Sequence, residues 1–272
     1  MTHRAHDYDH LIRRWRAVAR AAGLRMERWH RDGKYPLYVL RTGVLGTAGG
    51  IHLSAGIHGD EPGASEGLIA WAEAHAAELP HLPLLIVPCM NPWGLVNNTR
   101  VNRKFEDLNR LFHRNDLPLI AAWKELMEPY QFAVSMTLHE DFDGQGIYLY
   151  EVLRDQESWG HDLLALAREH IPIEPRRRLD GKKAAAGLIK RRLHLPWFNQ
   201  NGYPEAVWMH LYKAGRCYTV ETPSEYALPD RVAAQAAVVE GMVQRVIAGA
   251  EPTPLCRGGS VRKANVPSPT GW

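Results

Sequence analysis

The sequence predicts an α/β fold in which a mixed, mostly parallel central sheet is flanked by helices. Strand-length apolar runs alternate with segments of helical period along most of the 272 residues. Polar residues that could do chemistry follow several of these runs, as is typical of the carboxyl edge of an open α/β sheet. With 45% hydrophobic and 23% charged residues, the composition is that of an ordinary globular protein.

The N-terminal half is expected to contain three strands and one long helix. The strands are predicted at Tyr35–Arg41, Gly50–Ile57 and Leu84–Val87. The helix is predicted to begin at Pro62, because the first helical turn tolerates proline, and to end near Leu79, one residue before Pro80.

The C-terminal half continues the alternation of strands and helices. Strands are predicted at Ala133–Leu138, Gly146–Val152 and Cys217–Val220, and a helix at Trp159–His170. The closing helix, from Asp230 to about Ala248, is the clearest element because several valines and Met242 form one apolar face.

No internal repeat or convincing boundary divides the chain. We expect residues 1–248 to form a single domain and residues 249–272 a flexible tail, because the tail is rich in Pro, Gly and polar residues. Met1 to His10 lacks the apolar core of a secretory signal, and no run approaches the roughly 18 apolar residues of a membrane span. The cytoplasm is therefore the expected location, and no membrane partner is expected.

Basic residues cluster although the net charge is only +3. The clusters are Arg176–Arg178, Lys182–Lys183 and Lys190–Arg192. We interpret them as a solvated surface; an electrostatic funnel for acidic substrates and a phosphate-binding surface are the alternatives. Since no aromatic-interleaved nucleic-acid motif accompanies them, no nucleic-acid partner is expected.

Three residues from distant parts of the chain could meet at one place. His58, His139 and Glu221 each fall just after the end of a predicted strand, and ligands of open α/β sheets collect outside the carboxyl ends of the strands. The spacing His58-x-x-Glu61, on a turn between a strand and a helix, can point an imidazole and a carboxylate at one ion. Catalytic zinc sites commonly use two histidines and one glutamate and leave the fourth position to water.

These signals are weak when each is taken alone, because isolated histidines usually lie in the core or on the surface. Two further motifs change the interpretation: Asn91-Pro92-Trp93-Gly94 and Asp107-Leu108-Asn109-Arg110. Here the sequence resembles the zinc carboxypeptidase family, whose pattern is His-x-x-Glu, Asn-Pro-x-Gly, an Arg, Asp-x-Asn-Arg, a later His and a late Glu. All six features occur in this order between residues 58 and 221, about 60% of the chain.

The resemblance implies a site for one Zn²⁺ per chain. His58, Glu61 and His139 would bind the zinc, and Asp107 would hydrogen-bond to His58, as carboxylates do when they fix the tautomer of a ligand. The acidic residues that follow, Glu140, Asp141 and Asp143, are interpreted as a solvated turn before Gly144; a supporting role at the zinc and the binding of a second metal are the alternatives.

The resemblance also implies roles at the substrate. Arg100 would lie over the scissile carbonyl oxygen, and Asn109 and Arg110 would bind a free carboxylate, which matches the planar fork of a guanidinium. Glu221 would be the general base. Tyr203 and Tyr212 are candidates for the tyrosine that covers bound substrate in many zinc carboxypeptidases, and Tyr203 is preferred because it lies on a loop that could move, although the spacing of neither fits the family pattern well.

Two activities stay open. The first is a metallocarboxypeptidase that hydrolyses a C-terminal peptide bond. The second is an N-acyl amino acid amidohydrolase, because the compact chain also resembles the aspartoacylase and succinylglutamate desuccinylase branch. In either case the substrate would be a peptide or an acylated amino acid with a free carboxylate. A non-catalytic binding module would lack a ligand or the base, and neither is missing here. The sequence does not predict an oligomeric state.

Overall fold

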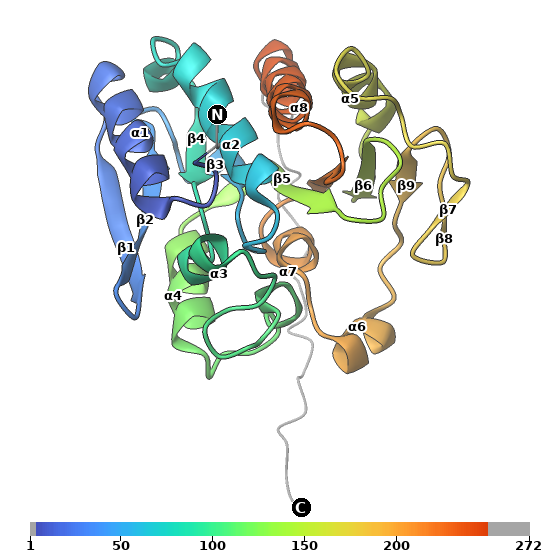
Figure 1. The fold of residues 1–272 in the computed structure, drawn as a ribbon, viewed down its shortest axis with the longest axis horizontal. Coiled ribbons are helices and arrows are strands. Elements are labelled where there is room, and N and C mark those ends of the chain that lie inside the picture. Colours follow the sequence, from blue (N-terminus) through green and yellow to red (C-terminus); the bar gives the residue numbers. More distant parts are fainter. Residues whose placement is uncertain (1–3, 250–272) are drawn as a thin grey trace, which may run out of the picture.

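A computed structural model describes residues 4–249, which form one central sheet covered by helices on both faces (Figure 1). The sheet has eight strands in the order β1-β2-β4-β3-β5-β10-β6-β9. Their bounds are β1 Met26–Asp32, β2 Tyr35–Arg41, β3 Ala48–Ser54, β4 Leu84–Val87, β5 Gln131–Asp141, β6 Tyr148–Leu153, β9 Leu188–Lys190 and β10 Arg216–Pro223. A two-stranded sheet pairs β7 (Arg178–Leu179) with β8 (Lys182–Lys183).

Parallel pairing dominates the middle of the sheet. The neighbours β4 and β3, β3 and β5, and β5 and β10 run parallel, and so do β6 and β9 at one edge. The pairs β1–β2, β2–β4 and β10–β6 are antiparallel. The predicted fold class, a mixed and mostly parallel sheet, is therefore confirmed.

The helices divide between the two faces of the sheet (Figure 1). The α-helices are α1 Tyr8–Ala21, α2 Pro62–Ala74, α3 Pro92–Asn97, α4 Pro118–Met127, α5 Gly160–Ala167, α6 Leu195–Asn201, α7 Glu205–Tyr212 and α8 Leu228–Ala248. One core packs α1, α2, α5 and α8 on one face, and a second packs α4 and α7 on the other. Alternate residues of one strand serve the two cores: Val220 lies in the first and Cys217 in the second.

Several element boundaries differ from those predicted. Helix α2 ends at Ala74 rather than near Leu79, because the chain turns there before a short 3₁₀ helix, Leu79–His81. Strand β3 ends at Ser54 rather than Ile57, whereas β5 and β10 run on to Asp141 and Pro223. Strand pairing, which sequence periodicity does not report, sets these ends.

Several elements were not predicted at all. They include α1, β1 and α4, which surround the predicted strands, and α6, α7 and β9, which lie near the polar edge of the sheet. Apart from Gly249, the predicted tail at 249–272 lies outside the described residues. Within residues 4–249, every helix is either too short or too polar to cross a bilayer.

Candidate metal centre and active site

His58 and Glu61 lie on the short connection between β3 and α2. Glu61 occupies the N-cap position of α2 and Pro62 follows as the first helical residue, a position where proline loses no hydrogen bond. Both side chains are nearly inaccessible, with 2% of His58 and 6% of Glu61 exposed. The turn therefore holds an imidazole and a carboxylate together inside the protein.

His139 comes from a strand and not from a loop. The prediction that His139 and Glu221 follow the ends of their strands is wrong, because His139 lies within β5 and Glu221 within β10, where the two residues are direct register partners. Both still lie within three residues of the carboxyl ends of these parallel strands. The expected convergence at that edge is observed.

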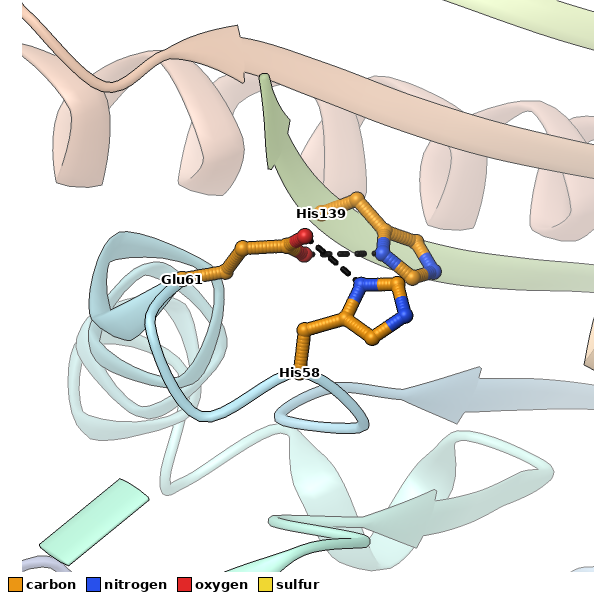
Figure 2. Close-up of side chains that lie close together, drawn as sticks. All are labelled: His58, Glu61 and His139. Carbon is orange, nitrogen blue, oxygen red and sulfur yellow. Dashed lines mark hydrogen bonds and ion pairs between the residues drawn. The ribbon is translucent and has the colours of Figure 1, made fainter. Parts of the chain in front are cut away.

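The three side chains face one another across a small space (Figure 2). Nδ1 of His58 lies 2.6 Å from Oε1 of Glu61, and Nδ1 of His139 lies 2.8 Å from Oε2 of the same carboxylate. One potential ligand atom from each residue lies within 4.8 Å of the others. Among residues 4–249, this is the one such cluster of histidine, cysteine and acidic side chains.

The charges in this cluster favour an ionised carboxylate. Burial alone would raise the pKa of Glu61, but the two imidazoles hold it far below its ordinary value. Burial would lower the pKa of His58, yet Glu61 and Asp107 raise it to about 9. Burial lowers the pKa of His139 despite the nearby Glu61. Without a metal, a proton on Nδ1 of His58 bridges to the carboxylate of Glu61. A divalent cation would take the place of this proton.

This donor set fits a catalytic zinc ion. Two imidazole nitrogens and one carboxylate are the protein ligands of a common class of zinc hydrolase site, with one position left for water. The second requirement, an orienting partner for a ligand histidine, is also met: Oδ1 of Asp107 lies 3.1 Å from Nε2 of His58. Nδ1 of His58 is thereby left for the shared space.

Asp107 also connects the cluster to Arg100. Its Oδ2 accepts a 3.1 Å hydrogen bond from Nε of Arg100, whose Nη1 donates to Oε1 of Glu61 at 3.3 Å. Burial would raise the pKa of Asp107, but His58 and Arg100 lower it well below its ordinary value. Arg100 is thus held through Nε and Nη1 beside the three candidate ligands.

The Asn-Pro-x-Gly motif is a structural support for these loops. Asn91 caps α3 by accepting from Gly94 N at 2.9 Å, and its Nδ2 donates to the carbonyl oxygens of Ile57 and Val101. These carbonyls belong to residues adjacent to His58 and to Arg100. Asn91 therefore joins the ligand turn to the segment that carries the arginine.

Glycine is required where the ligand turn touches α3. A Cβ atom on Gly59 would lie 1.8 Å from the carbonyl carbon of Gly94, and a Cβ on Gly94 would lie 2.4 Å from Nδ2 of Asn91. Both contacts are far shorter than van der Waals separation, so neither position can carry a larger side chain without a backbone shift.

Glu140 supports the cluster from behind, and its interpretation as part of a solvated turn is wrong. Only 4% of it is exposed, and its carboxylate accepts from Gly63 N and from Nη1 of Arg231, both at 2.7 Å. Its backbone N–H donates to Oε2 of Glu61 at 3.1 Å. Glu140 thus joins the start of α2 to β5 and to α8. The exposed turn begins after it, at Phe142 and Asp143.

Glu221 is the second acid of the site. Its backbone pairs with His139 on one side and with Tyr148 of β6 on the other. Burial raises the pKa of Glu221 well above its ordinary value, and the negative charges of Glu61 and Asp141 raise it further. A carboxyl group with these properties can take up a proton and release it, as general acid–base chemistry requires.

Asn109 and Arg110 lie in the 3₁₀ turn Leu108–Arg110 that follows Asp107. Asn109 is buried, and its Oδ1 accepts from the backbone N–H of Glu205 at 2.8 Å. Its Nδ2 is therefore the group left for other contacts. Arg110 is exposed, and the one hydrogen bond of its side chain within the described part of the chain runs from Nη1 to the carbonyl oxygen of Asn109, at 2.9 Å. Its guanidinium can bind an anion.

Comparisons with known proteins show what this chain is similar to. Residues 49–153 match the family model described as the succinylglutamate desuccinylase/aspartoacylase catalytic domain. The resemblance to the zinc carboxypeptidases, near the aspartoacylase and succinylglutamate desuccinylase branch, is confirmed. The matched segment includes His58, Glu61 and His139 but ends before Glu221. The comparison with curated proteins found no match.

Solved structures show the same fold. A candidate metallopeptidase from Shewanella denitrificans OS217 superposes with a TM-score of 0.78 and 17% identity, covering 89% of this chain and 91% of that one. Its counterpart from Shewanella amazonensis SB2B superposes with a TM-score of 0.77 and 21% identity, covering 89% of this chain and 94% of that one. Carboxypeptidase A from Helicoverpa armigera superposes with a TM-score of 0.61 and 13% identity, covering 90% of this chain and 74% of that one. The matching family model and the shared fold fit a zinc metallocarboxypeptidase or a hydrolase of the aspartoacylase type.

Tyr203 lies beside the zinc carboxypeptidase-like Asn-Arg motif but turns its hydroxyl elsewhere. Its backbone N–H donates to the carbonyl oxygen of Arg110 at 3.0 Å, whereas its hydroxyl donates to Oδ1 of Asn199 on α6 at 2.6 Å. The ring packs at a tilt against His113 and edge-on against Phe198. Its role as a covering tyrosine stays a prediction.

Sequence reasoning missed Tyr148 and Tyr150, which lie near Glu221, and Arg191, which packs against Tyr150. The pKa values of Tyr148 and Tyr150 on β6 are raised by burial and also by the charge of Glu221. The guanidinium of Arg191 lies 5.7 Å from the ring centre of Tyr150 and 4.8 Å from that of Phe198. Only the basic cluster at Lys190–Arg192 marked this arginine in the sequence, and an exposed position was the expectation.

Proposed function

We propose that this protein is a zinc metallocarboxypeptidase that hydrolyses a C-terminal amide bond. The observation that carries the proposal is the buried set of two imidazoles and one carboxylate with a second acid, Glu221, on the neighbouring strand beside His139. His58, Glu61 and His139 would hold one zinc ion. When bound, zinc would polarise the scissile carbonyl and lower the pKa of a water molecule toward neutrality.

The chain's own residues would do the rest. Glu221 would accept the proton of the attacking water at its carboxylate and return it to the leaving nitrogen, which makes it the general base and then the general acid. Its raised pKa supports this role, since a carboxyl with an ordinary pKa holds a proton poorly at neutral pH.

Arg100 would stabilise the negative charge that develops on the carbonyl oxygen. The ion pairs with Asp107 and Glu61 use its Nε and Nη1, and no acceptor for Nη2 lies in residues 4–249. A donor that is already oriented stabilises a developing oxyanion without reorganisation, and removal of such a donor typically costs about 3 to 4 kcal/mol of transition-state stabilisation.

Asn109 and Arg110 would bind the terminal carboxylate of the substrate, and we call these two residues the carboxylate clamp. The orientation of Asn109 supports this assignment, because its Oδ1 is already bonded to Glu205 and its Nδ2 remains as a donor. A guanidinium beside an amide N–H₂ gives the parallel donors that a carboxylate prefers.

A second candidate is supported by Arg191. This guanidinium is packed against Tyr150, Trp197 and Phe198 and has no ion pair with any described acid. Burial lowers its pKa and the positive charge of Arg110 lowers it further, whereas Tyr150 and Asp180 offset only part of the shift. If the substrate portion held by the carboxylate clamp carried a second anionic group, that group would stabilise the charged form of Arg191 against burial and against the charge of Arg110. Together with the matched family model, this favours an acylated amino acid with an acidic side chain as the alternative substrate.

A substrate panel separates the two candidates. Zinc-loaded protein would be assayed with blocked dipeptides ending in neutral or acidic residues and with N-acetyl- and N-succinyl-amino acids. Turnover of the dipeptides supports the carboxypeptidase; turnover of the acylated amino acids alone would overturn it in favour of the amidohydrolase. Arg191→Met should raise KM for acidic substrates at least tenfold and leave KM for neutral ones unchanged if Arg191 binds the second anion.

We also propose the cytoplasm as the location. Cys89 and Cys217 are both buried and unpaired, which fits a compartment that keeps thiols reduced. Fractionation of the producing cells would test this proposal.

A further inference from the structure

A second buried polar cluster lies outside the metal centre. It contains His52 and Ser54 of β3, Ser135 of β5 and Glu205, the first residue of α7, and at most 1% of each residue is exposed. The hydroxyl of Ser54 donates to Oε2 of Glu205 at 3.2 Å, and Nδ1 of His52 lies 2.9 Å from Oγ of Ser135. Complete burial prevents contact with substrate, so these residues do not act as a nucleophilic triad.

Two atoms of the cluster have no hydrogen-bond partner. They are Nε2 of His52 and Oε1 of Glu205, which lie 3.7 Å apart. A buried carboxylate with one hydroxyl donor would be strongly destabilising, because burial without compensating partners disfavours charge. Burial accordingly raises the pKa of Glu205 to about 8. The group is a neutral acid at pH 7.

Glu205 is joined directly to the carboxylate clamp through its backbone. Its N–H donates to Oδ1 of Asn109 at 2.8 Å. The same two segments are connected by the bonds from Tyr203 N to the carbonyl oxygen of Arg110 and from Phe112 N to that of Tyr203. At Gly202, where φ is +83°, a Cβ would lie 2.1 Å from the carbonyl oxygen of Arg110. Residues 202–205 thus run tightly alongside residues 109–112. Glu205 is the last residue of the first segment, and it is buried.

We infer that Glu205 is a positioning residue for the carboxylate clamp: its buried carboxyl fixes the first turn of α7, and the backbone N–H of that turn fixes the amide of Asn109. This inference rests on the proposed function, because it takes the clamp as the site of the substrate carboxylate. Asn109 accepts from Glu205, so its N–H₂ group stays directed away from α7 and available to the substrate. Without the anchor, the amide can rotate and α7 can shift.

The inference has a pH signature. The titratable groups near the Glu205 carboxyl are His52 on β3 and Cys217 on β10. Burial lowers the pKa of His52 to about 3 and raises that of Cys217 well above its ordinary value, so both stay neutral from pH 6 to pH 9. Glu205 is then the member of the cluster that gains charge near pH 8. Above that pH the anchor should loosen and KM should rise.

The test compares Glu205→Leu, Glu205→Gln and a control, Val207→Ala, which creates a cavity on the same helix without touching the clamp. With a substrate of the zinc-loaded enzyme, Glu205→Leu should raise KM about ten- to hundredfold, the effect of losing one oriented hydrogen bond to a charged group, and change kcat less than about threefold. Glu205→Gln keeps an acceptor for Ser54 and a donor toward His52. Its KM should stay within about twofold of wild type at pH 7 and should lack the rise above pH 8. Val207→Ala should lower the melting temperature and leave KM unchanged.

An unchanged KM in Glu205→Leu, or an equal rise in Val207→Ala, would overturn the inference. Should Glu205→Leu fail to fold, Ser54→Ala takes its place, because it removes the hydroxyl bonded to Oε2. If the wild type turns over none of the panel substrates, the proposed function fails, and hydrogen exchange of the backbone N–H of residue 205, which donates to Oδ1 of Asn109, decides the inference alone. That N–H should exchange slowly in the wild type and fast in Glu205→Leu; equal exchange in both would refute the inference.

Discussion

Asn91 provides a sensitive test of how the site is held together, because it is buried and touches no predicted ligand or substrate. Substitution by alanine removes the cap of α3 and the donors to the carbonyl oxygens of Ile57 and Val101. Loss of an N-cap costs about 1 kcal/mol, and each buried carbonyl left without its donor costs about 1 kcal/mol more. We therefore expect Asn91→Ala to lower the free energy of unfolding by about 3 kcal/mol.

Activity should fall as well, since the two carbonyls flank the segments that hold His58 and Arg100. The matched control is Asn97→Ala, which removes an exposed bond from Nδ2 to the carbonyl oxygen of Trp93 within α3 and should cost less than about 0.5 kcal/mol. Urea unfolding with an unchanged m-value measures both. If Asn91→Ala is as stable and as active as Asn97→Ala, the motif does not support the site as described.

Three further predictions follow from the same geometry. Gly59→Ala would place a Cβ 1.8 Å from the backbone of Gly94 and should cost more than about 2 kcal/mol in thermal or urea unfolding, whereas Gly43→Ala, with nothing within 4 Å, should be nearly neutral. Arg100→Lys keeps the charge but loses the fork, so kcat should fall about a hundredfold with little change in KM; an unchanged kcat would exclude a role at the oxyanion. The buried acid Glu205 has its pKa raised to about 8, so between about pH 5 and pH 8 the unfolded chain releases a proton that the folded protein retains. The free energy of unfolding should therefore fall as pH rises through this range, by at most about 1.4 kcal/mol per unit, and Glu205→Gln should remove this slope in urea titrations at several pH values. Equal slopes in both proteins would refute a neutral buried Glu205.

The parts of the site that lie in short motifs could be predicted from the sequence. His58 and Glu61 are three residues apart on one turn, and Asp107 and Asn109 are two apart, so local geometry already constrains each pair. The strand-length apolar runs also gave the central strands, because parallel strands buried on both faces are continuously apolar. The resemblance to the zinc carboxypeptidases, whose motifs occur here in the same order, then implied the candidate metal centre.

The rest depends on contacts between distant segments. The register that sets Glu221 beside His139 is a property of strand pairing, and no periodicity reports it. Glu140 was assigned to solvent because acidic residues before a glycine usually form turns, whereas its partner Arg231 comes from α8. The same holds for Glu205 and Arg191, whose environments are created by α7 and by the rings of Tyr150 and Phe198.

The central claim is that two imidazoles and one carboxylate hold a single catalytic zinc ion while Glu221 serves as the base. Zinc content and turnover, measured on wild type, His139→Ala and Glu221→Gln after dialysis, test it most directly. We predict one zinc per chain in the wild type and in Glu221→Gln, less than about a tenth of that in His139→Ala, and loss of turnover in both variants. Full zinc content in His139→Ala, or wild-type turnover in Glu221→Gln, would contradict the account.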